Sequence, residues 1–429
     1  MLTSGMTRTT GRGPAMTDLT SPSADRHVDH GRDLEPAAWL HELLEERPLH
    51  READHDPPFL VLSRFDDVVA ALKQPEVWQN GDGPGVFSQR GGVLGSADDP
   101  DHARQRRVLR PAFLPSVMKA LRPRVEALAD ELAAGFVEQG CGDFVELYAF
   151  PFPALVVGEL LGVHADDRED FKRWSVAVVN ALGGGDLAAY EEATHSIWDY
   201  IDARLAEREE LLPAGPDRPD GDLLGTVLPD DVISRMLLAV RAGELSRVEA
   251  RRLGHQLLVA GHETTTSLIA LLFYRFAQRP ELAERVRSDP SLIEAAIEEG
   301  LRFDSPVQGL FRTNACPVRL RGEDIAEKTK MQLLFAAANR DPRHWEDPDE
   351  FRLDRDPRLQ RSHVAFGWGI HHCIGAPVAR LETRVTLERL LPRMADLELA
   401  GEPETTETFI LRGLAKLPLR WRPVSARVG

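Results

Sequence analysis

The chain has 429 residues, of which 42% are hydrophobic and 28% are charged, and its formal net charge is −17. This composition is typical of a globular protein, and the negative charge argues against a general nucleic-acid binder, which needs a basic face. The three cysteines, Cys141, Cys316 and Cys373, lie far apart, which excludes a disulfide framework and favours a reducing cytoplasm. No run approaches the roughly 18 apolar residues of a membrane span, and the N-terminus has no signal-peptide core.

The first part of the chain predicts a leader and then a folded unit. Residues 1–33 are rich in small and polar residues without apolar periodicity, so we expect a disordered leader followed by one domain over residues 34–425. Helical spacing begins at residues 37–44, an apolar run at 59–62 predicts a strand, and residues 66–72 predict a helix. The glycine-rich segment 78–97 predicts a long loop, which either covers a ligand pocket or is a tolerated surface loop.

The next segment carries a basic helix face. His102 and Arg106 are four residues apart and therefore share one face, where they could grip an anion or form a solvated basic surface. Residues 117–212 are mostly helical in pattern, with a buried helix at 155–162. Residues 213–222 predict a linker, and residues 230–238 predict a further amphipathic helix.

A long helix follows, beginning with a capping box. Ser246 and Glu249 have the spacing of this motif, so the helix is expected to begin at Arg247 and to end before Pro280. At 1.5 Å per residue such a helix would be roughly 45 Å long, enough to cross a whole domain.

The middle of this predicted helix breaks the local rules, since it places a glycine, a glutamate and three threonines among apolar residues. Gly261 would let something large approach the backbone. Thr264 could bond back to a carbonyl or open the helix to water, and Glu263 could relay protons. The alternative is a kinked core helix with a satisfied polar cluster.

A second capping box is predicted at Ser291 and Glu294. The helix that it opens would end at Glu299 and Arg302, whose i, i+3 spacing allows an ion pair. A pair of this kind contributes little when it lies on the surface. An extended apolar stretch over 304–312 and irregular Pro/Asp-rich segments over 336–351 lead to the last motif.

That motif spans residues 366–375, where glycines surround Cys373 and a helix-forming segment follows at once. Backbone N–H groups at the start of that helix would point to the sulfur and stabilise a thiolate. The pattern indicates an anionic sulfur ligand held under a flat group, or else a glycine-rich turn with a buried free cysteine. A zinc site at His371, His372 and Cys373 is a weak alternative, since no further ligand cluster accompanies it.

Four segments in this order make the chain resemble the bacterial cytochrome P-450 haem-thiolate monooxygenases, from about Leu34 to Pro423. Any one of them is only suggestive, whereas the set is highly specific. The segments are the loop with Phe366, Gly367, Gly369, His371, Cys373 and Gly375; the motif Ala260, Gly261, Glu263 and Thr264; the pair Glu299 and Arg302; and residues 338–342.

The resemblance implies a mainly α single-domain fold with small β-sheets, shaped like a triangular prism, with haem b between the long central helix and the cysteine loop. Cys373 would be the axial thiolate ligand of the iron, with Phe366 packed near the sulfur. Gly369 and Gly375 would let the loop lie against the haem. The other haem contacts would come from His102, Arg106, Arg312 and His371, which would hold the propionates, and from Ala260, Gly261 and Gly367.

The same resemblance implies the reaction, the insertion of one oxygen atom from dioxygen into a hydrophobic or amphipathic small molecule by hydroxylation or oxidative dealkylation. Thr264 and Glu263 would deliver protons to dioxygen. The substrate pocket would be lined by Val307, Gln308, Gly309 and Leu310, by the loop 80–97 and by residues near Ala260.

The protein would be a cytoplasmic monomer, without a membrane or nucleic-acid partner. Two electrons would come from a ferredoxin and its reductase, docking on a basic surface formed by Arg104, Arg107, Arg110, Arg380 and Arg384. The alternatives are a peroxide-dependent peroxygenase or isomerase and a non-catalytic haem- or ligand-binding protein.

Some positions depart from the family pattern. Trp368 stands where many relatives have histidine, and residues 326–328 replace a common Pro-Ala-Gly turn. The usual Pro-x-Arg-Phe reads Pro-Asp-Glu-Phe at 348–351, so we expect Arg355 to supply the charge that joins Glu299 and Arg302.

Overall fold

The computed structural model describes residues 30–424 except 31, 89–90, 164–166, 168–169, 171–172, 175, 179–185 and 214–222. Most of the predicted leader 1–33 and of the predicted linker 213–222 therefore lies outside the described residues. His30 stacks on Trp39 with ring centroids 4.5 Å apart, so contacts with the folded chain begin four residues before the predicted boundary at Leu34.

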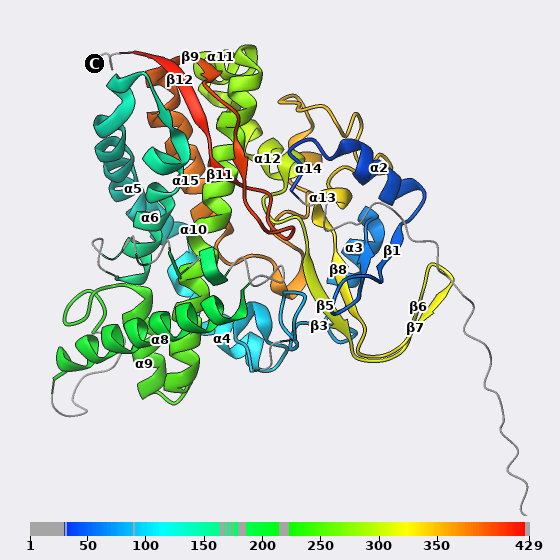
Figure 1. Cartoon of the computed structure of the whole chain (residues 1–429). Coiled ribbons are helices and arrows are strands. Elements are labelled where there is room, and N and C mark those ends of the chain that lie inside the picture. Colours follow the sequence, from blue (N-terminus) through cyan, green and yellow to red (C-terminus); the bar gives the residue numbers. More distant parts are fainter. Residues whose placement is uncertain are drawn as a thin grey trace, which may run out of the picture.

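Helices are the main secondary structure of the described chain (Figure 1). They are α2 (Ala37–Glu45), α3 (Phe65–Leu72), α4 (Asp101–Leu109), α5 (Pro115–Phe136), α6 (Pro151–Leu161), α8 (Leu187–Glu210), α9 (Val232–Arg241), α10 (Arg247–Gln278), α11 (Pro280–Ser288), α12 (Ile293–Asp304), α13 (Phe335–Ala338), α14 (Pro357–Gln360) and α15 (Ala376–Arg389). The predicted helices at 37–44, 66–72, 155–162 and 230–238 are confirmed, with ends that differ by at most four residues.

The strands form small sheets, the largest of which lies beside the helical part in Figure 1. Its order is β1-β2-β8-β5-β3, and β2 pairs with β8 in parallel although the two are far apart in sequence. The strands are β1 (Leu49–Glu52), β2 (Phe59–Leu62), β3 (Trp78–Gln79), β4 (Cys141–Asp143), β5 (Leu310–Asn314), β6 (Val318–Leu320), β7 (Glu323–Ile325), β8 (Lys330–Leu333), β9 (Met394–Leu399), β10 (Glu404–Thr405), β11 (Leu414–Lys416) and β12 (Pro418–Pro423). The three smaller sheets have the strand orders β4-β12-β9, β10-β11 and β6-β7.

Helix α10 is the centre of the helical part and packs against α6, α8, α12 and α15. The predicted capping box is present, since the Ser246 side chain accepts from the Glu249 N–H and the Glu249 carboxylate accepts from the Ser246 N–H. The helix is long and apolar enough to cross a membrane, but 72% of its most apolar 18-residue window is buried inside the protein. It is therefore a core helix, and its central polar residues do not interrupt it.

The second predicted capping box is wrong. Asp289 accepts from the backbone and hydroxyl of Ser291, a short 3₁₀ turn spans Pro290–Leu292, and α12 begins only at Ile293. The capping box requires the Ser291 hydroxyl, but this hydroxyl donates to the nearby carboxylate of Asp289 instead. Glu294 instead pairs with Arg384 of α15 and with Arg361 at 2.7 Å.

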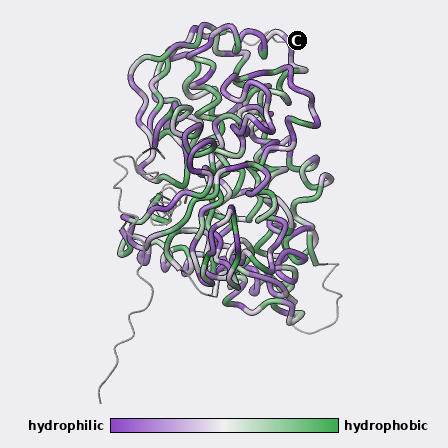
Figure 2. The backbone as a smooth tube through the Cα atoms, turned by 90° about the vertical axis from the view of Figure 1, so that its right-hand side faces the viewer, coloured by the Kyte–Doolittle hydropathy of each residue, from purple (hydrophilic) through white to green (hydrophobic). Residues whose placement is uncertain are grey.

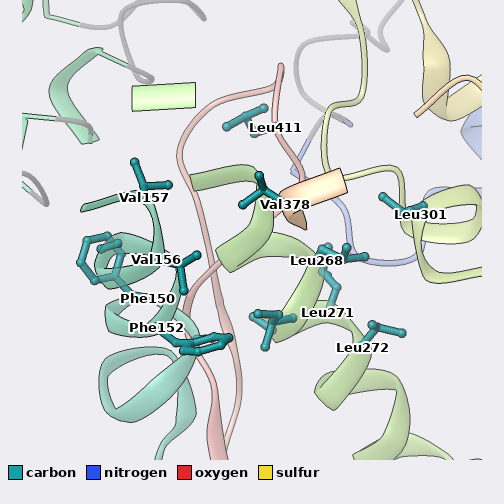
Figure 3. Close-up of a cluster of buried hydrophobic side chains, with 14 of the residues drawn as sticks. Phe150, Phe152, Val156, Val157, Leu268, Leu271, Leu272, Leu301, Val378 and Leu411 are labelled. Carbon is teal, nitrogen blue, oxygen red and sulfur yellow. The ribbon is translucent and has the colours of Figure 1, made fainter. Parts of the chain in front are cut away.

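The main core lies where α6, α10, α12 and α15 meet. Figure 3 shows Val156 and Val157 of α6, Leu268 and Leu271 of α10 and Val378 of α15 in this cluster. Along the tube in Figure 2, hydrophilic and hydrophobic residues alternate at short intervals, as expected for amphipathic elements.

Gly261 serves this core packing. A Cβ added there would lie 2.8 Å from Cγ2 of Val157, so the large neighbour expected from sequence includes helix α6.

Candidate active site

The cysteine loop is built by backbone hydrogen bonds and ends on a helix. The Cys373 N–H donates to the Phe366 carbonyl at 2.9 Å, and α15 begins three residues after the cysteine. Burial raises the pKa of the Cys373 thiol, while hydrogen bonds from the Gly375 and Ala376 N–H groups and the charges of Arg106 and Arg380 lower it, so that burial dominates. The predicted N–H donors are present, but they favour a thiolate only in combination with a further cationic group at the sulfur.

The loop glycines have different reasons to be glycine. Gly367 and Gly369 have φ of 68° and 70°, where glycine is favoured. A Cβ on Gly369 would lie 2.6 Å from the Leu72 carbonyl oxygen, so helix α3 is what requires this glycine. The expectation that Gly369 lets the loop lie against the haem stays a prediction, and the contact with α3 is a second reason for this glycine. By contrast, a Cβ on Gly375 would lie 3.8 Å from Sγ of Cys373.

The departure at residue 368 lies away from the cysteine. Nζ of Lys73 lies 5.6 Å from the centroid of the Trp368 ring, and the ring packs against the core cluster beneath the largest sheet. Trp368 borders neither hollow beside Cys373. The tryptophan therefore anchors the loop to α3 rather than facing the sulfur.

Two hollows meet at Cys373, an inner cavity of about 280 Å³ and an outer one of about 940 Å³. The inner cavity lies between α10 and the cysteine loop, as the resemblance implies for the haem. Apart from its basic residues its lining is mainly apolar and includes Leu94, Val157, Leu160, Leu257, Ala260, Gly261, Thr264, Leu268, Val307, Leu310, Phe366, Gly367, Cys373 and Gly375.

Four basic side chains border the inner cavity: His102, Arg106, Arg312 and His371. The rings of His102 and His371 lie 4.2 Å apart. Within the described residues, Nε2 of His102 and both ring nitrogens of His371 have no hydrogen-bond partner. Burial lowers the pKa of Arg312 to about 10, and burial together with the charges of Arg312, His102 and Arg106 lowers that of His371 to about 3.

Buried donors without partners are costly, so this cluster fits an anionic group bound in the cavity. Arg106 is positioned by its Nη2, which donates to the His372 carbonyl at 2.7 Å, and this bond ties α4 to the cysteine loop. Two carboxylates, such as those of haem, match the donor set.

Of the predicted proton-delivery pair, Thr264 borders the inner cavity and Glu263 does not. Oγ1 of Thr264 donates to the Ala260 carbonyl at 3.2 Å and Thr264 borders the inner cavity, so the hydroxyl bonds back to its own helix. Glu263 does not border the cavity, and its Oε1 lies 3.7 Å from Nε2 of His262.

Only half of the predicted pocket residues on the extended stretch border the inner cavity. Val307 and Leu310 do, whereas Gln308 and Gly309 do not. Gln308 is buried and accepts from Nη2 of Arg412 at 3.0 Å, because neighbouring side chains of an extended chain point to opposite sides. A Cβ on Gly309 would lie 2.5 Å from the Leu333 carbonyl oxygen, so this glycine serves the sheet. Of the loop 80–97, Leu94 and Gly95 border the cavity.

Gln256 is a lining residue that the sequence reasoning missed. Helical spacing contained the signal, because residues 256, 260, 264 and 268 share one face of α10 and all border the cavity. Oε1 of Gln256 is buried and has no donor within the described residues. The amide oxygen is therefore an acceptor without a donor on the α10 side of the cavity.

Glu299 and Arg302 form a fully buried pair, with Nη2 of Arg302 2.7 Å from Oε1 of Glu299. Nε of Arg355 lies 3.0 Å from the same oxygen, which confirms that Arg355 joins the pair. The Arg302 guanidinium also donates to the carbonyls of Asn339 and Pro348. The cluster thus ties α12 to the irregular segment that precedes the cysteine loop.

The outer hollow is basic, but the predicted arginine surface is smaller than expected. Arg107, Arg110 and Arg380 border the hollow, whereas Arg104 and Arg384 do not. Arg104 pairs with Asp101 and Glu249, at 2.6 and 2.5 Å. Arg384 pairs with Glu294, so both charges are locally balanced.

Comparison with known proteins identifies the family of the chain. The family model described as cytochrome P-450 matches residues 175–418. The chain is 35% identical over 399 residues to the vitamin D(3) 25-hydroxylase of Pseudonocardia autotrophica, covering 89% of this chain and 92% of the relative. It is 32% identical over 426 residues to the cytochrome P-450 monooxygenase PikC of Streptomyces venezuelae, covering 95% of each.

A solved structure shows that the fold is shared as well. The crystal structure of CalO2 superposes with a TM-score of 0.79 at 30% identity, covering 92% of this chain and 97% of CalO2. That family carries a haem with a cysteine thiolate ligand, and in this chain Cys373 lies at the hollow with the matching donors. The chain therefore belongs to the cytochrome P-450 family and is a monooxygenase with the mostly helical fold of that family.

Proposed function

We propose that residues 34–425 form one catalytic domain that binds haem b and inserts one oxygen atom from dioxygen into a hydrophobic or amphipathic small molecule. The reaction would be a hydroxylation or an oxidative dealkylation. The observation that carries this proposal is the meeting of Cys373, the apolar α10 wall and a set of buried donors without partners at one cavity. The protein would work as a cytoplasmic monomer.

The haem would be held from both sides. Cys373 would bind its iron through the thiolate, and Ala260, Gly261, Phe366, Gly367 and Gly375 border the same cavity and would contact the haem. His102, Arg106, Arg312 and His371 would donate to its propionates in charge-assisted hydrogen bonds. When bound, the thiolate-ligated haem supplies dioxygen activation, which electron donation from sulfur favours.

Proton delivery would begin at the hydroxyl of Thr264. That hydroxyl donates its hydrogen to the Ala260 carbonyl, so in this arrangement it can only accept from a group in the cavity, and it would deliver a proton after turning away from the carbonyl. Glu263 and His262 lie behind the wall, 3.7 Å apart at their nearest polar atoms, and would resupply the proton through a rotation of the glutamate.

The lining supports an amphipathic substrate. The wall formed by Leu94, Leu160, Leu257, Val307 and Leu310 would bury an apolar body. The amide of Gln256 offers that body one polar contact. One relative is named a vitamin D(3) 25-hydroxylase, which is consistent with a substrate of this kind.

Electrons would come from a ferredoxin that docks on the outer hollow. Arg107, Arg110 and Arg380 border this hollow on a strongly acidic protein, although Glu244 and Glu298 balance part of the charge of Arg107 and Arg380. Leu114 adds an exposed apolar side chain. Such a basic patch would steer an acidic partner towards the cysteine side.

The test is turnover by the haem-loaded protein with a ferredoxin, its reductase and isotopically heavy dioxygen. The substrates come from a screen of apolar alcohols and ketones for the spin-state change of the haem. The proposal predicts a product that carries one heavy oxygen atom. Turnover with peroxide but never with ferredoxin would instead support the peroxygenase alternative, and no turnover with either would support a binding protein.

A further inference from the structure

A buried carboxylate lies behind the cysteine loop. Glu298 of α12 is 1% exposed and is held between two partners. Nε of Arg380 donates to its Oε1 at 2.6 Å and Nη2 of Arg380 to its Oε2 at 2.8 Å, while Nε2 of His363 lies 3.0 Å from Oε2. Burial alone would raise the pKa of Glu298, but the hydrogen bonds from Arg380 and His363 outweigh burial and lower it to about 2, so the carboxylate is charged.

Arg380 connects this carboxylate with the sulfur. It lies on α15, borders the outer hollow beside Cys373, and its guanidinium carbon is 4.6 Å from the centroid of the Phe366 ring. Phe366 in turn accepts the Cys373 N–H through its carbonyl. The positive charge of Arg380 is among the influences that favour the Cys373 thiolate.

A second pair joins the same two helices and provides a comparison. Glu294 and Arg384 lie four residues before Glu298 and four residues after Arg380, and each is 33% exposed. Neither borders the hollows at Cys373, and no aromatic contact links Arg384 to the described part of the loop. This pair therefore has the chemistry of Glu298 and Arg380 without their position.

We propose that Glu298 and Arg380 form an electrostatic pair that sets the reduction potential of the haem-loaded protein. Arg380 places positive charge beside the Cys373 sulfur, and Glu298 cancels part of it. Both are positioning residues, since neither touches the reacting atoms. The inference rests on the proposed function, because it requires a thiolate-ligated haem.

The signs follow from Coulomb's law in a buried setting. Reduction adds one electron to the iron–thiolate unit, so nearby positive charge favours the reduced form. Removing the negative charge of Glu298 should raise the potential, and removing the positive charge of Arg380 should lower it. Removing both should return the potential towards the wild-type value.

The experiment is a spectroelectrochemical titration of the haem-loaded protein, with dithionite as the electron source. The variants are E298Q, R380Q, the double variant and E294Q. We expect a positive shift for E298Q, a negative shift for R380Q, a smaller shift than either for the double variant, and no shift for E294Q. Shifts of the same sign for the two single variants, or an equal shift for E294Q, would overturn the proposal.

The same set of variants separates an effect of charge from an effect of misfolding. Gln is nearly isosteric with Glu and can still accept from Arg380, so E298Q removes charge while keeping the geometry. R380K keeps the positive charge and should stay close to wild type if R380Q proves unstable. Every variant is first checked for the red-shifted carbon monoxide band of thiolate-ligated haem. A wild-type protein without this band overturns the proposed function and the inference together, whereas a normal band with unshifted potentials overturns the inference alone.

Discussion

Glu299 is fully buried and serves two arginines, Arg302 at 2.7 Å and Arg355 at 3.0 Å. Replacing it with Gln would leave two buried guanidinium groups without a counter-charge. Breaking a buried ion pair in this way costs on the order of 3–5 kcal/mol. We expect E299Q to lower the free energy of unfolding by about that amount, as measured by denaturant titration.

The matched control is Glu398, whose partner Arg420 lies 3.0 Å away on the surface, with side chains 57% and 63% exposed. E398Q should change the free energy of unfolding by less than about 1 kcal/mol. Equal effects of the two substitutions would show that the buried cluster is not structural.

Gln256 makes a different prediction, because its partner is expected to be a ligand. Q256L should weaken binding of an alcohol such as cyclododecanol, whose O–H can donate to Oε1, about fivefold, the value of one hydrogen bond of roughly 1 kcal/mol, and leave cyclododecane unaffected. The measurement is the dissociation constant from the spin-state change of the haem. As a control, L257A removes apolar contact and should weaken both probes alike. Parallel losses with Q256L would contradict the assigned role.

Which residues lie at the candidate site was predictable from sequence where a motif contains them, as for Cys373, Arg302 and Arg355. The neighbouring groups that require a particular residue type at a position were harder to predict. Gly369 and Gly261 are required by the Leu72 carbonyl and by Val157, neighbours that sequence spacing does not reveal. Burial of Glu299 likewise changes a weak surface pair into an enclosed one.

At the scale of elements, the two predicted capping boxes make a natural comparison. The Ser246 hydroxyl caps α10 by accepting from the Glu249 N–H at 3.2 Å, whereas the Ser291 hydroxyl bonds to Asp289 instead. S246A should therefore lower the free energy of unfolding by about 1 kcal/mol, and S291A by clearly less. Thermal unfolding of the two variants measures the difference, and an equal loss would contradict the assigned caps.

Element boundaries were predictable wherever local chemistry decides them, and the long α10 helix is the clearest case. Pairing between distant strands was not. The strand at 59–62 was predicted, but its parallel partner at 330–333 depends on the packing of everything between them. Lys328 has φ of 61° in the turn where relatives commonly have Pro-Ala-Gly, so the lysine occupies a conformation that glycine would adopt more readily.

At the scale of the whole molecule, the charge distribution is uneven. The chain carries a net charge of −17, yet Arg107 and Arg110 border the hollow beside Cys373. The double variant R107A/R110A should slow reduction by a ferredoxin severalfold at low ionic strength, and the difference should shrink as salt is added. Stopped-flow reduction measures the rate.

R420A, an exposed arginine that does not border the outer hollow, should leave the reduction rate unchanged. A salt-independent loss in R107A/R110A would instead point to a structural effect.

The central claim is that Cys373 supplies the thiolate of a haem bound between α10 and its loop. The most direct measurement is the carbon monoxide difference spectrum of the reduced, haem-loaded protein, compared with the C373S variant and with C316S as a control for a free cysteine that borders neither hollow. We predict the red-shifted thiolate band in wild type and C316S and its loss in C373S. The same band in C373S, or its absence from the wild-type protein, would contradict the claim.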